Sequence, residues 1–260
     1  MKAKLLVINE IGAINRVLRL VSLLSDYPHL NAKQAADLLG WPVSSTHRLL
    51  RKLADLEFAQ QTDKGNFSAG MELYRIVGRL SGKMPFAEIA EPLLAALTAQ
   101  FNETSMLTIL ERRQLRMYTA LAASPQDPMR YVVELNRRAP LVWGAAGRAL
   151  LAHLGQDEIE TAITTCDTPN IRGEVLDEAE IRGALEETVR KGFAMTRSHR
   201  TLNSIGVAVP FFGSQGDVIG SVGFQIPSFR FRDEQTDGLV KALTQTASII
   251  AQQIGAKPSF

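Results

Sequence analysis

The sequence predicts an α+β protein with a small, helix-rich N-terminal part and a larger C-terminal part that contains a mainly antiparallel sheet. Two observations predict this fold class. Residues 13–80 carry apolar residues at helical spacing in several short stretches, whereas residues 104–226 carry apolar runs of strand length between helical stretches. The run Ser81-Gly82-Lys83-Met84-Pro85 separates the two parts, because glycine and proline interrupt a helix.

Charge is distributed unevenly between these parts. Residues 1–84 hold 12 Lys and Arg against 7 Asp and Glu, a balance of +5. The remainder holds 17 Lys and Arg against 20 Asp and Glu, a balance of −3. A basic first third joined to a mildly acidic remainder is typical of a polyanion-binding module attached to a domain with another task.

Composition excludes several other classes of protein. Hydrophobic residues make up 45% and charged residues 22% of the chain, as in an ordinary globular protein. Cys166 is the only cysteine, so no internal disulfide can form and a cytoplasmic location is expected. No apolar stretch reaches the roughly 18 residues that a membrane helix needs, so no membrane partner is expected.

Three short helices are predicted in the basic third, at Ala13 to Ser25, Ala32 to Leu39 and Ser44 to Leu56. Asn31 is a good N-cap for the second helix, and Gly40-Trp41-Pro42 supplies a tight turn before the third. This order is the helix-turn-helix arrangement. The buried stripe of the third helix is predicted to consist of Leu49, Leu50, Leu53 and Leu56.

Two short strands, Phe58 to Gln61 and Asn66 to Ala69, are predicted to follow. They flank a turn at Asp63-Lys64-Gly65, in which glycine supplies a positive dihedral angle. With this hairpin, residues 1–70 are predicted to form a winged helix-turn-helix domain. The alternative interpretation is a small helical domain whose charged face is merely solvated. The order of elements, the turn residues and the side on which the charges lie agree on the winged domain.

The third predicted helix carries side chains suited to double-stranded DNA. Small hydroxyl groups at its N-terminal end let the backbone approach the duplex, and basic side chains farther along meet phosphates or base edges. We expect contacts to base edges from Ser44, Ser45, His47 and Arg48, and contacts to phosphates from Arg51, Lys52 and, at the tip of the wing, Lys64.

Residues 71–84 are predicted to link the two domains. Met71 to Leu80 reads as a short amphipathic helix with Arg75 and Arg79 outward. An apolar stripe that is exposed between domains needs a partner, so a homodimer or a dimer of dimers is expected.

The C-terminal part, residues 85–260, is predicted to place helices around an antiparallel set of about six strands. Helices are predicted at Ala87 to Phe101, Ala145 to Leu154, Glu158 to Thr164, Glu178 to Lys191 and Asp233 to Ile254. Strands are predicted at Thr104 to Leu110, Leu115 to Ala122, Arg130 to Leu135, Phe193 to Arg197, Ile205 to Phe212 and Val218 to Ile226.

No motif typical of catalysis is found. The sequence contains no Gly-x-Ser-x-Gly, Gly-x-Gly-x-x-Gly, phosphate-loop or His-Glu-x-x-His motif, so we expect no catalytic residue, no metal site and no cofactor. The alternative class is a small-molecule-binding enzyme or carrier with an accessory helical domain. The classes differ in one simple property, because a regulator binds its own upstream DNA with a steep salt dependence and an enzyme does not.

Two sets of motifs together span nearly the whole chain. The first set is Trp41-Pro42-Val43-Ser44-Ser45-Thr46-His47-Arg48-Leu49-Leu50 with Leu53, Leu56-Glu57-Phe58-Ala59 and Phe67-Ser68-Ala69-Gly70. The second set is Pro140-Leu141, Ala145-Ala146-Gly147-Arg148-Ala149-Leu150-Leu151-Ala152, Arg190-Lys191-Gly192-Phe193-Ala194, Gly206-Val207-Ala208-Val209-Pro210 and Gly220-Ser221-Val222-Gly223. Both sets resemble the IclR family of bacterial transcription regulators. The chain departs from the family at Val43, where lysine is frequent, and at Phe67 and Ala69; the first departure concerns one phosphate contact.

This resemblance implies a ligand-responsive, DNA-binding regulator of a catabolic pathway, with a palindromic operator. It also implies that residues 85–260 form a GAF-like effector-binding domain, whose ligand in the family is usually a small carboxylate or an aromatic acid. Amides at a helix N-terminus would face the anion on one wall. Carried onto this chain, that wall is Gly144, Ala145 and Ala146, and the facing wall is Thr196, Gly206, Gly223 and Gln225.

Three departures from the family concern the effector. Thr196-Arg197-Ser198-His199 stands where many members have an acidic run, so donors for a carboxylate or phenolate replace negative charge; the alternative for Arg197 and His199 is a solvated loop. Trp143 is expected to narrow the pocket or stack on an aromatic ligand, the alternative being a core aromatic. Gly206 and Gly223 are expected to leave room for a ring. We therefore expect an aromatic acid as effector, with Trp143, Arg197 and Ser198 among its contacts.

Overall fold

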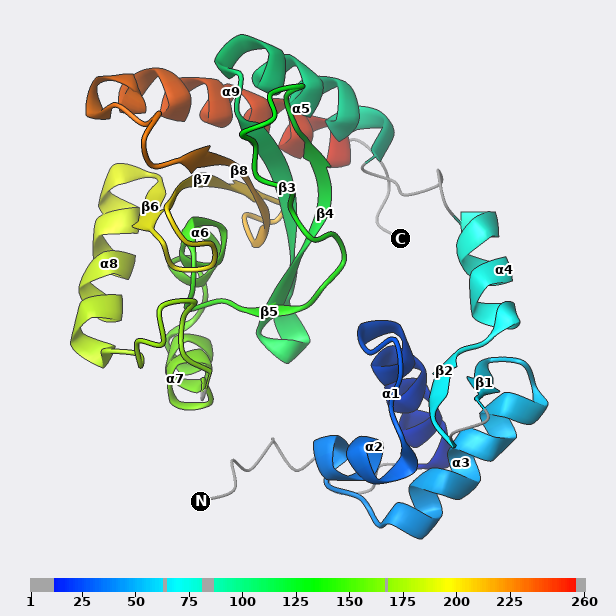
Figure 1. Cartoon of the computed structure of the whole chain (residues 1–260). Coiled ribbons are helices and arrows are strands. Elements are labelled where there is room, and N and C mark those ends of the chain that lie inside the picture. Colours follow the sequence, from blue (N-terminus) through cyan, green and yellow to red (C-terminus); the bar gives the residue numbers. More distant parts are fainter. Residues whose placement is uncertain (1–11, 63–64, 81–86, 167, 256–260) are drawn as a thin grey trace. The chain divides into compact units, whose positions relative to one another are not determined.

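The computed structural model describes residues 12–62, 65–80, 87–166 and 168–255 (Figure 1). These residues divide into two compact units, one within residues 12–80 and one within residues 87–255. The smaller unit is mainly helical, whereas the larger unit is built around a six-stranded sheet. Lys64 of the predicted wing tip and the separating run 81–85 lie outside the described residues.

The smaller unit is a winged helix-turn-helix, as the sequence predicts. Its two strands pair antiparallel, with Ala59 opposite Ala69 and Gln61 opposite Phe67. Leu30 exchanges backbone hydrogen bonds of 3.0 and 2.8 Å with Phe67, so the wing is attached to the loop before the second helix. The elements are α1 (Ala13–Asp26), α2 (Ala32–Leu39), α3 (Val43–Asp55), β1 (Ala59–Gln61), β2 (Phe67–Ala69) and α4 (Met71–Leu80).

Local sequence signals explain the turns of this unit. Asn31 and Gln34 form a capping box, in which each side chain accepts a hydrogen bond from the other residue's backbone N–H, at 2.9 and 2.8 Å. Gly65 has a φ of 73°, as expected for the turn of the wing. The prediction that Leu56 is buried is wrong: Leu56 is 65% exposed, because α3 ends one residue earlier and the chain then turns at Glu57, with a φ of 60°.

The larger unit contains one sheet in the order β5-β4-β3-β8-β7-β6, and every neighbouring pair is antiparallel. The predicted α+β class with a mainly antiparallel sheet is therefore confirmed. The strands are β3 (Thr104–Glu111), β4 (Arg116–Ala123), β5 (Ala139–Pro140), β6 (Ala194–Arg197), β7 (Ser204–Phe212) and β8 (Val218–Pro227). The helices are α5 (Ala87–Phe101), α6 (Ala145–Leu151), α7 (Gln156–Thr164), α8 (Glu178–Lys191) and α9 (Thr236–Gly255), with short 3-10 turns at Arg112–Gln114 and Asp233–Gln235.

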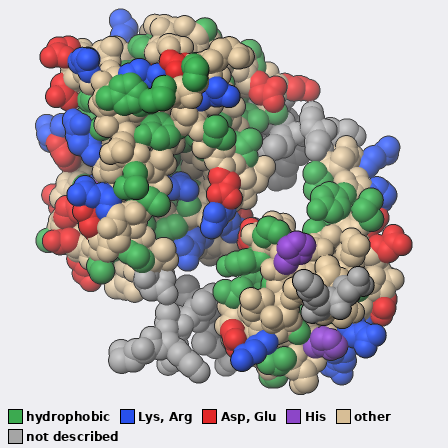
Figure 2. Space-filling model, in the orientation of Figure 1, with side chains coloured by type: hydrophobic (Ala, Val, Ile, Leu, Met, Phe, Trp, Pro, Cys, Tyr) green, Lys and Arg blue, Asp and Glu red, His purple; other side chains and the backbone are tan. Residues whose placement is uncertain are grey.

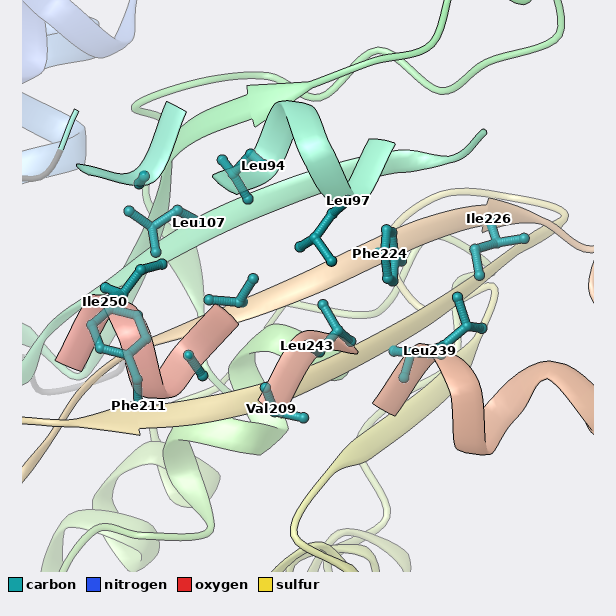
Figure 3. Close-up of a cluster of buried hydrophobic side chains, with 14 of the residues drawn as sticks. Leu94, Leu97, Leu107, Val209, Phe211, Phe224, Ile226, Leu239, Leu243 and Ile250 are labelled. Carbon is teal, nitrogen blue, oxygen red and sulfur yellow. The ribbon is translucent and has the colours of Figure 1, made fainter. Parts of the chain in front are cut away.

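The sheet is covered by helices on both faces. Figure 1 shows α5 and α9 on one side and α6 and α8 on the other. Figure 3 shows the larger hydrophobic cluster, where side chains of α5 and α9 meet those of β3, β7 and β8. Because side chains alternate along a strand, Val207 and Val209 of β7 belong to this cluster, whereas Ala208 packs with Ala145 and Ala149 of α6. Small side chains thus let α6 lie close to the sheet.

One predicted strand is absent: residues 130–135 have no regular secondary structure. The outer edge of β4 pairs instead with β5, through Arg116 and Met117. The segment is held by isolated hydrogen bonds, including one at 2.8 Å from the N–H of Asn136 to the carbonyl oxygen of Thr119. Val132 is 83% exposed, so its apolar side chain does not mark a core strand. This segment passes along the sheet without joining it.

Candidate functional site

Helix α3 presents a cationic face to solvent. Arg48, Arg51 and Lys52 are all exposed, and none forms an ion pair with any residue that the structure describes. Ser44, also exposed, lies one turn before Arg48, so hydroxyl and guanidinium share one face of the helix. Ser45 is half-buried. Figure 2 shows Lys and Arg side chains on the part of the smaller unit where α3 lies.

The opposite side of α3 fixes this face in place. Leu50 and Leu53 are buried in the core of the smaller unit, and buried Thr46 donates a hydrogen bond of 3.1 Å to the carbonyl oxygen of Pro42. The exposed ring of His47 packs edge-on to Phe67 of the wing, with ring centroids 6.1 Å apart. His47 therefore lies at the junction of α3 and the wing. The structure brings together every predicted DNA contact of this unit except Lys64, which lies outside the described residues.

The larger unit contains a cavity of about 260 Å³. Its floor is the α6-facing side of β7 and β8, and its walls are the beginning of α6, the segment 132–137 and the segment 199–201. The residues predicted for the effector that do line it are Gly144, Ala145, Ala146, Thr196, Gly206, Gly223 and Gln225.

Three other residues predicted as effector contacts lie outside the lining. Trp143 is buried in the second hydrophobic cluster and donates a hydrogen bond of 2.8 Å from Nε1 to the carbonyl oxygen of Thr168. Arg197 is exposed and pairs with Asp233 at 3.3 Å. Ser198 accepts a hydrogen bond of 3.0 Å from a backbone N–H within its own loop. These three residues therefore do not line the cavity, and contacts between them and the effector stay a prediction that the geometry does not support.

Gly206 and Gly223 of the facing wall allow neighbouring elements to pack closely against their strands. A Cβ at Gly223 would lie 2.7 Å from the carbonyl oxygen of Val207 and 3.0 Å from Cβ of Ala208, so the neighbouring strand fills that space. A Cβ at Gly206 would lie 3.2 Å from Cβ of Ala145. The expectation that Gly223 leaves room for a ring is therefore wrong, because β7 occupies the room.

Several lining residues were missed by the sequence reasoning. Arg200 is the most informative, since it follows directly on the Thr196-Arg197-Ser198-His199 departure. Its stem lies against Gly144, where an added Cβ would meet Cδ of Arg200 at 2.9 Å. Gly144 also has a φ of 85°, which favours glycine. The other missed residues are Met106, Thr119, Val132, Val133, Glu134, Arg137, Thr201, Ser204, Val207, Ala208 and Phe224.

His199, which the sequence left open between pocket and solvent, lines the cavity. Its ring packs edge-on to Trp143, with centroids 5.6 Å apart, and its buried Nδ1 has no hydrogen-bond partner in the described part of the chain. Burial lowers the pKa of His199, and the guanidinium of Arg148 lowers it further. Arg148 itself is buried and pairs with Glu180 at 2.8 Å. A neutral imidazole therefore borders the cavity.

Metal and membrane chemistry receive no support from the described residues. Within residues 12–62, 65–80, 87–166 and 168–255, no three His, Cys, Asp or Glu side chains gather as a possible metal site. Over the same residues, every helix is too short or too polar to span a bilayer. Cys166 is a thiol whose Sγ donates a hydrogen bond of 3.6 Å to the carbonyl oxygen of Thr168.

The chain joins a winged helix-turn-helix with an exposed cationic helix to an α+β unit that contains a cavity. This combination is typical of helix-turn-helix transcriptional regulators. The chain belongs to the IclR family of bacterial transcriptional regulators: residues 13–63 match the family model of the IclR helix-turn-helix domain, and residues 79–252 match that of the bacterial transcriptional regulator IclR C-terminal domain.

Individual relatives agree with this assignment. The HTH-type transcriptional regulator KipR of Bacillus subtilis is 22% identical, over 95% of this chain and 98% of KipR. An IclR transcriptional regulator from Alicyclobacillus acidocaldarius has a similar structure, with a TM-score of 0.78 and 23% identity over 95% of this chain and 100% of that one. An IclR homologue from Microbacterium hydrocarbonoxydans, solved in complex with 4-hydroxybenzoate, gives a TM-score of 0.70 and 23% identity over 95% and 100% of the two chains. The named relatives are transcriptional regulators rather than enzymes.

Proposed function

We propose that this protein is a ligand-responsive regulator of a catabolic pathway, which binds a palindromic double-stranded DNA operator and senses a small carboxylate, most favourably an aromatic acid. The observation that carries the proposal is the exposed face of α3, on which Arg48, Arg51 and Lys52 have no acidic partner among the described residues. Water solvates these exposed charges, so the face costs the free protein little free energy. Binding to DNA phosphates is favourable, because counterions condensed on the DNA are released.

The proposed division of labour follows the chain. Residues 1–70 bind DNA, residues 71–84 link, and residues 85–260 bind the effector and support oligomerisation. The linker helix α4 carries exposed Met71, Tyr74 and Leu80, and Figure 2 shows hydrophobic side chains over this helix. Met71 and Tyr74 are three residues apart and therefore neighbours on the helix surface. Exposed apolar side chains on a linker helix support a homodimer or a dimer of dimers. The proposed location is the cytoplasm.

The cavity supports a small effector. Its volume of about 260 Å³ is below the roughly 300–1,000 Å³ of pockets that hold drug-sized ligands. Its lining combines an apolar floor with hydroxyl groups of Thr196, Thr201 and Ser204, which suits a compact ring with polar substituents. The family neighbour from Microbacterium hydrocarbonoxydans is complexed with 4-hydroxybenzoate, a molecule of this kind.

The effector acts on DNA binding by linkage. A ligand shifts the DNA-bound population only when it binds the DNA-competent arrangement of the dimer more or less tightly than the other arrangement. Coupling of this kind changes affinity by about 5- to 150-fold in typical allosteric proteins.

Fluorescence anisotropy with the full chain tests the proposal. Labelled DNA from upstream of the protein's own gene is compared with a scrambled fragment, at several salt concentrations and with or without benzoate. We expect tighter binding to the upstream DNA, a logarithm of affinity that falls linearly with the logarithm of salt concentration, and a benzoate-dependent change. Equal affinity for both fragments at every salt concentration would overturn the regulator, whereas specific DNA binding unaffected by benzoate would overturn only the preference for an aromatic acid.

A further inference from the structure

The cavity of the larger unit holds one guanidinium that lacks a protein partner. Arg200 lines the cavity, and no residue that the structure describes forms a hydrogen bond or an ion pair with it. Arginine can donate up to five hydrogen bonds, so a guanidinium without a protein acceptor at a cavity is available to a ligand that supplies acceptors. Arg200 as a whole is exposed, which places its side chain at the mouth of the cavity rather than inside it.

Other arginines near Arg200 are each accounted for. Arg197 pairs with exposed Asp233 at 3.3 Å and lies over the ring of Phe231. Arg148 pairs with Glu180. Two charged lining residues, Arg137 and Glu134, pair with each other at 2.9 Å. Arg200 is therefore the one arginine of the lining without an ion pair to any residue that the structure describes.

The electrostatics of the site agree with this geometry. Protein packed around the guanidinium lowers the pKa of Arg200, the positive charge of Arg137 lowers it further, and Glu134 raises it. Guanidinium groups nevertheless remain protonated in proteins. A bound anion would relieve both the loss of hydration and the repulsion from Arg137.

The position of Arg200 is also fixed. Its stem lies on Gly144, so Cδ occupies the space in which a side chain at that position would stand. On the loop that carries it, Ser198 and Asn203 both have positive φ angles, of 53° and 55°, and are joined by the hydrogen bond from the N–H of Asn203 to Oγ of Ser198. The loop thus brings the stem of Arg200 against Gly144, directly before α6, and places the residue in the lining of the cavity.

We propose that Arg200 anchors the carboxylate of the effector and thereby makes the cavity selective for anionic over neutral ligands. This inference rests on the proposed effector-binding role of the larger unit. The planar guanidinium donates two parallel N–H groups to a carboxylate, a geometry that lysine cannot reproduce. The apolar part of the ligand then lies against the floor, where Met106 and Ala208 are exposed to the cavity.

Calorimetry on the full chain tests the anchor with three carboxylates, benzoate, 4-hydroxybenzoate and pyruvate, each paired with its carboxamide. The variants are Arg200→Met, which keeps the stem and removes the charge, and Arg200→Lys. Arg197→Met is the matched control, since its guanidinium lies outside the cavity lining. We expect at least one carboxylate to bind the unaltered protein at least about tenfold more tightly than its carboxamide, because a charged hydrogen-bonded pair is lost in the amide.

Arg200→Met should abolish that preference by weakening carboxylate binding and leaving carboxamide binding nearly unchanged. Arg200→Lys should retain part of it, and Arg197→Met all of it. The inference fails if no carboxylate is preferred over its amide, or if Arg200→Met and Arg197→Met behave alike. Anisotropy with upstream DNA, measured on the same preparations, separates this failure from that of the regulator: specific DNA binding that persists in all three variants leaves the proposed function standing.

Discussion

The hydroxyl of Tyr131 donates a hydrogen bond of 2.9 Å to the main-chain carbonyl oxygen of Leu202. The carbonyl oxygen of Asn203 lies 2.7 Å from the same hydroxyl and shares it. The contact joins two segments that border the cavity, one containing residues 132–134 and the other residues 199–201. Burial raises the pKa of Tyr131, so the hydroxyl stays protonated and able to donate at neutral pH.

Replacing Tyr131 by phenylalanine removes this link alone. We expect Tyr131→Phe to lower the free energy of unfolding by about 0.5–1.5 kcal/mol, the usual worth of one hydrogen bond, and to speed amide hydrogen exchange in both segments. Tyr118→Phe in β4 is the control, because the Tyr118 hydroxyl has no hydrogen-bond partner in the described part of the chain. Equal exchange rates in the two variants would show that the hydroxyl does not hold the segments together.

Removing Arg48 and Lys52 separately distinguishes base contacts from phosphate contacts. Arg48→Ala should reduce discrimination between upstream and scrambled DNA, by about 1–3 kcal/mol if it contacts a base edge. Lys52→Ala should weaken binding to both DNAs alike and reduce the slope of log affinity against log salt by about 1. Arg190→Ala, on exposed α8 of the larger unit, is the charge-matched control. If Arg48→Ala weakens both DNAs in equal proportion, its assignment to a base edge is wrong.

A charged residue introduced on α4 tests whether its exposed apolar side chains form the interface between subunits. Tyr74 is 62% exposed, so Tyr74→Glu should leave the fold of the smaller unit intact. We expect it to shift the assembly towards monomer in sedimentation velocity, because a carboxylate in an apolar interface loses its hydration. Val175→Glu, at a residue that is 84% exposed in the larger unit, should change nothing. An unchanged assembly in Tyr74→Glu would remove α4 from the interface.

Gly223→Ala tests the packing of β7 on β8. The added methyl group would lie 2.7 Å from the carbonyl oxygen of Val207, so backbone must move, and we expect a loss of about 1–3 kcal/mol in the free energy of unfolding. Gly183→Ala is the control within α8, where nothing lies within 4 Å of the added Cβ. That variant should be more stable by up to about 1 kcal/mol, since alanine favours a helix. Urea unfolding of both variants gives the comparison.

His153 should make stability depend on pH. Burial lowers the pKa of His153, whose ring packs edge-on to Phe212 at 5.1 Å and whose buried Nε2 has no hydrogen-bond partner among the described residues. The unfolded chain therefore binds this proton more tightly than the folded protein does. The resulting stability is present above pH 6.5, the ordinary pKa, and is lost as the pH falls through the lowered value.

We therefore expect the melting temperature to fall between pH 7.5 and pH 5.5, by an amount that scales with the lowered pKa. His153→Phe should make this fall shallower without abolishing it, because His199 titrates in the same direction. His29→Gln, at an exposed position of the smaller unit, should leave the fall unchanged. An identical pH profile for His153→Phe and the unaltered protein would contradict the prediction.

Elements whose signals are local could be predicted from the sequence almost residue by residue. The helices Ala32–Leu39, Met71–Leu80 and Glu178–Lys191 have the predicted bounds, because periodicity and caps such as Asn31 lie within each segment. The conformation of the segment 130–135 could not be predicted in this way. Whether it forms a strand depends on which residues pair with the edge of β4, and β5 occupies that edge.

The cavity shows the same limit. The motifs predict its inner wall at Gly144, Ala145 and Ala146, whereas the arginine of this loop that lines the cavity is Arg200 and not the predicted Arg197. The choice between them is made by the loop that turns at Ser198 and Asn203, and no local residue preference specifies which guanidinium then faces inward. Both candidates are arginines, so the conformation of the loop, and not the residue type, determines which of them lines the cavity.

The segment between β4 and β5 borders the cavity while standing outside the ladder of the sheet. Substitutions of its exposed side chains change the lining of the cavity and leave the backbone pairing of the strands in place. The sequence of this short span can therefore vary without a shift in register among the strands that form the floor.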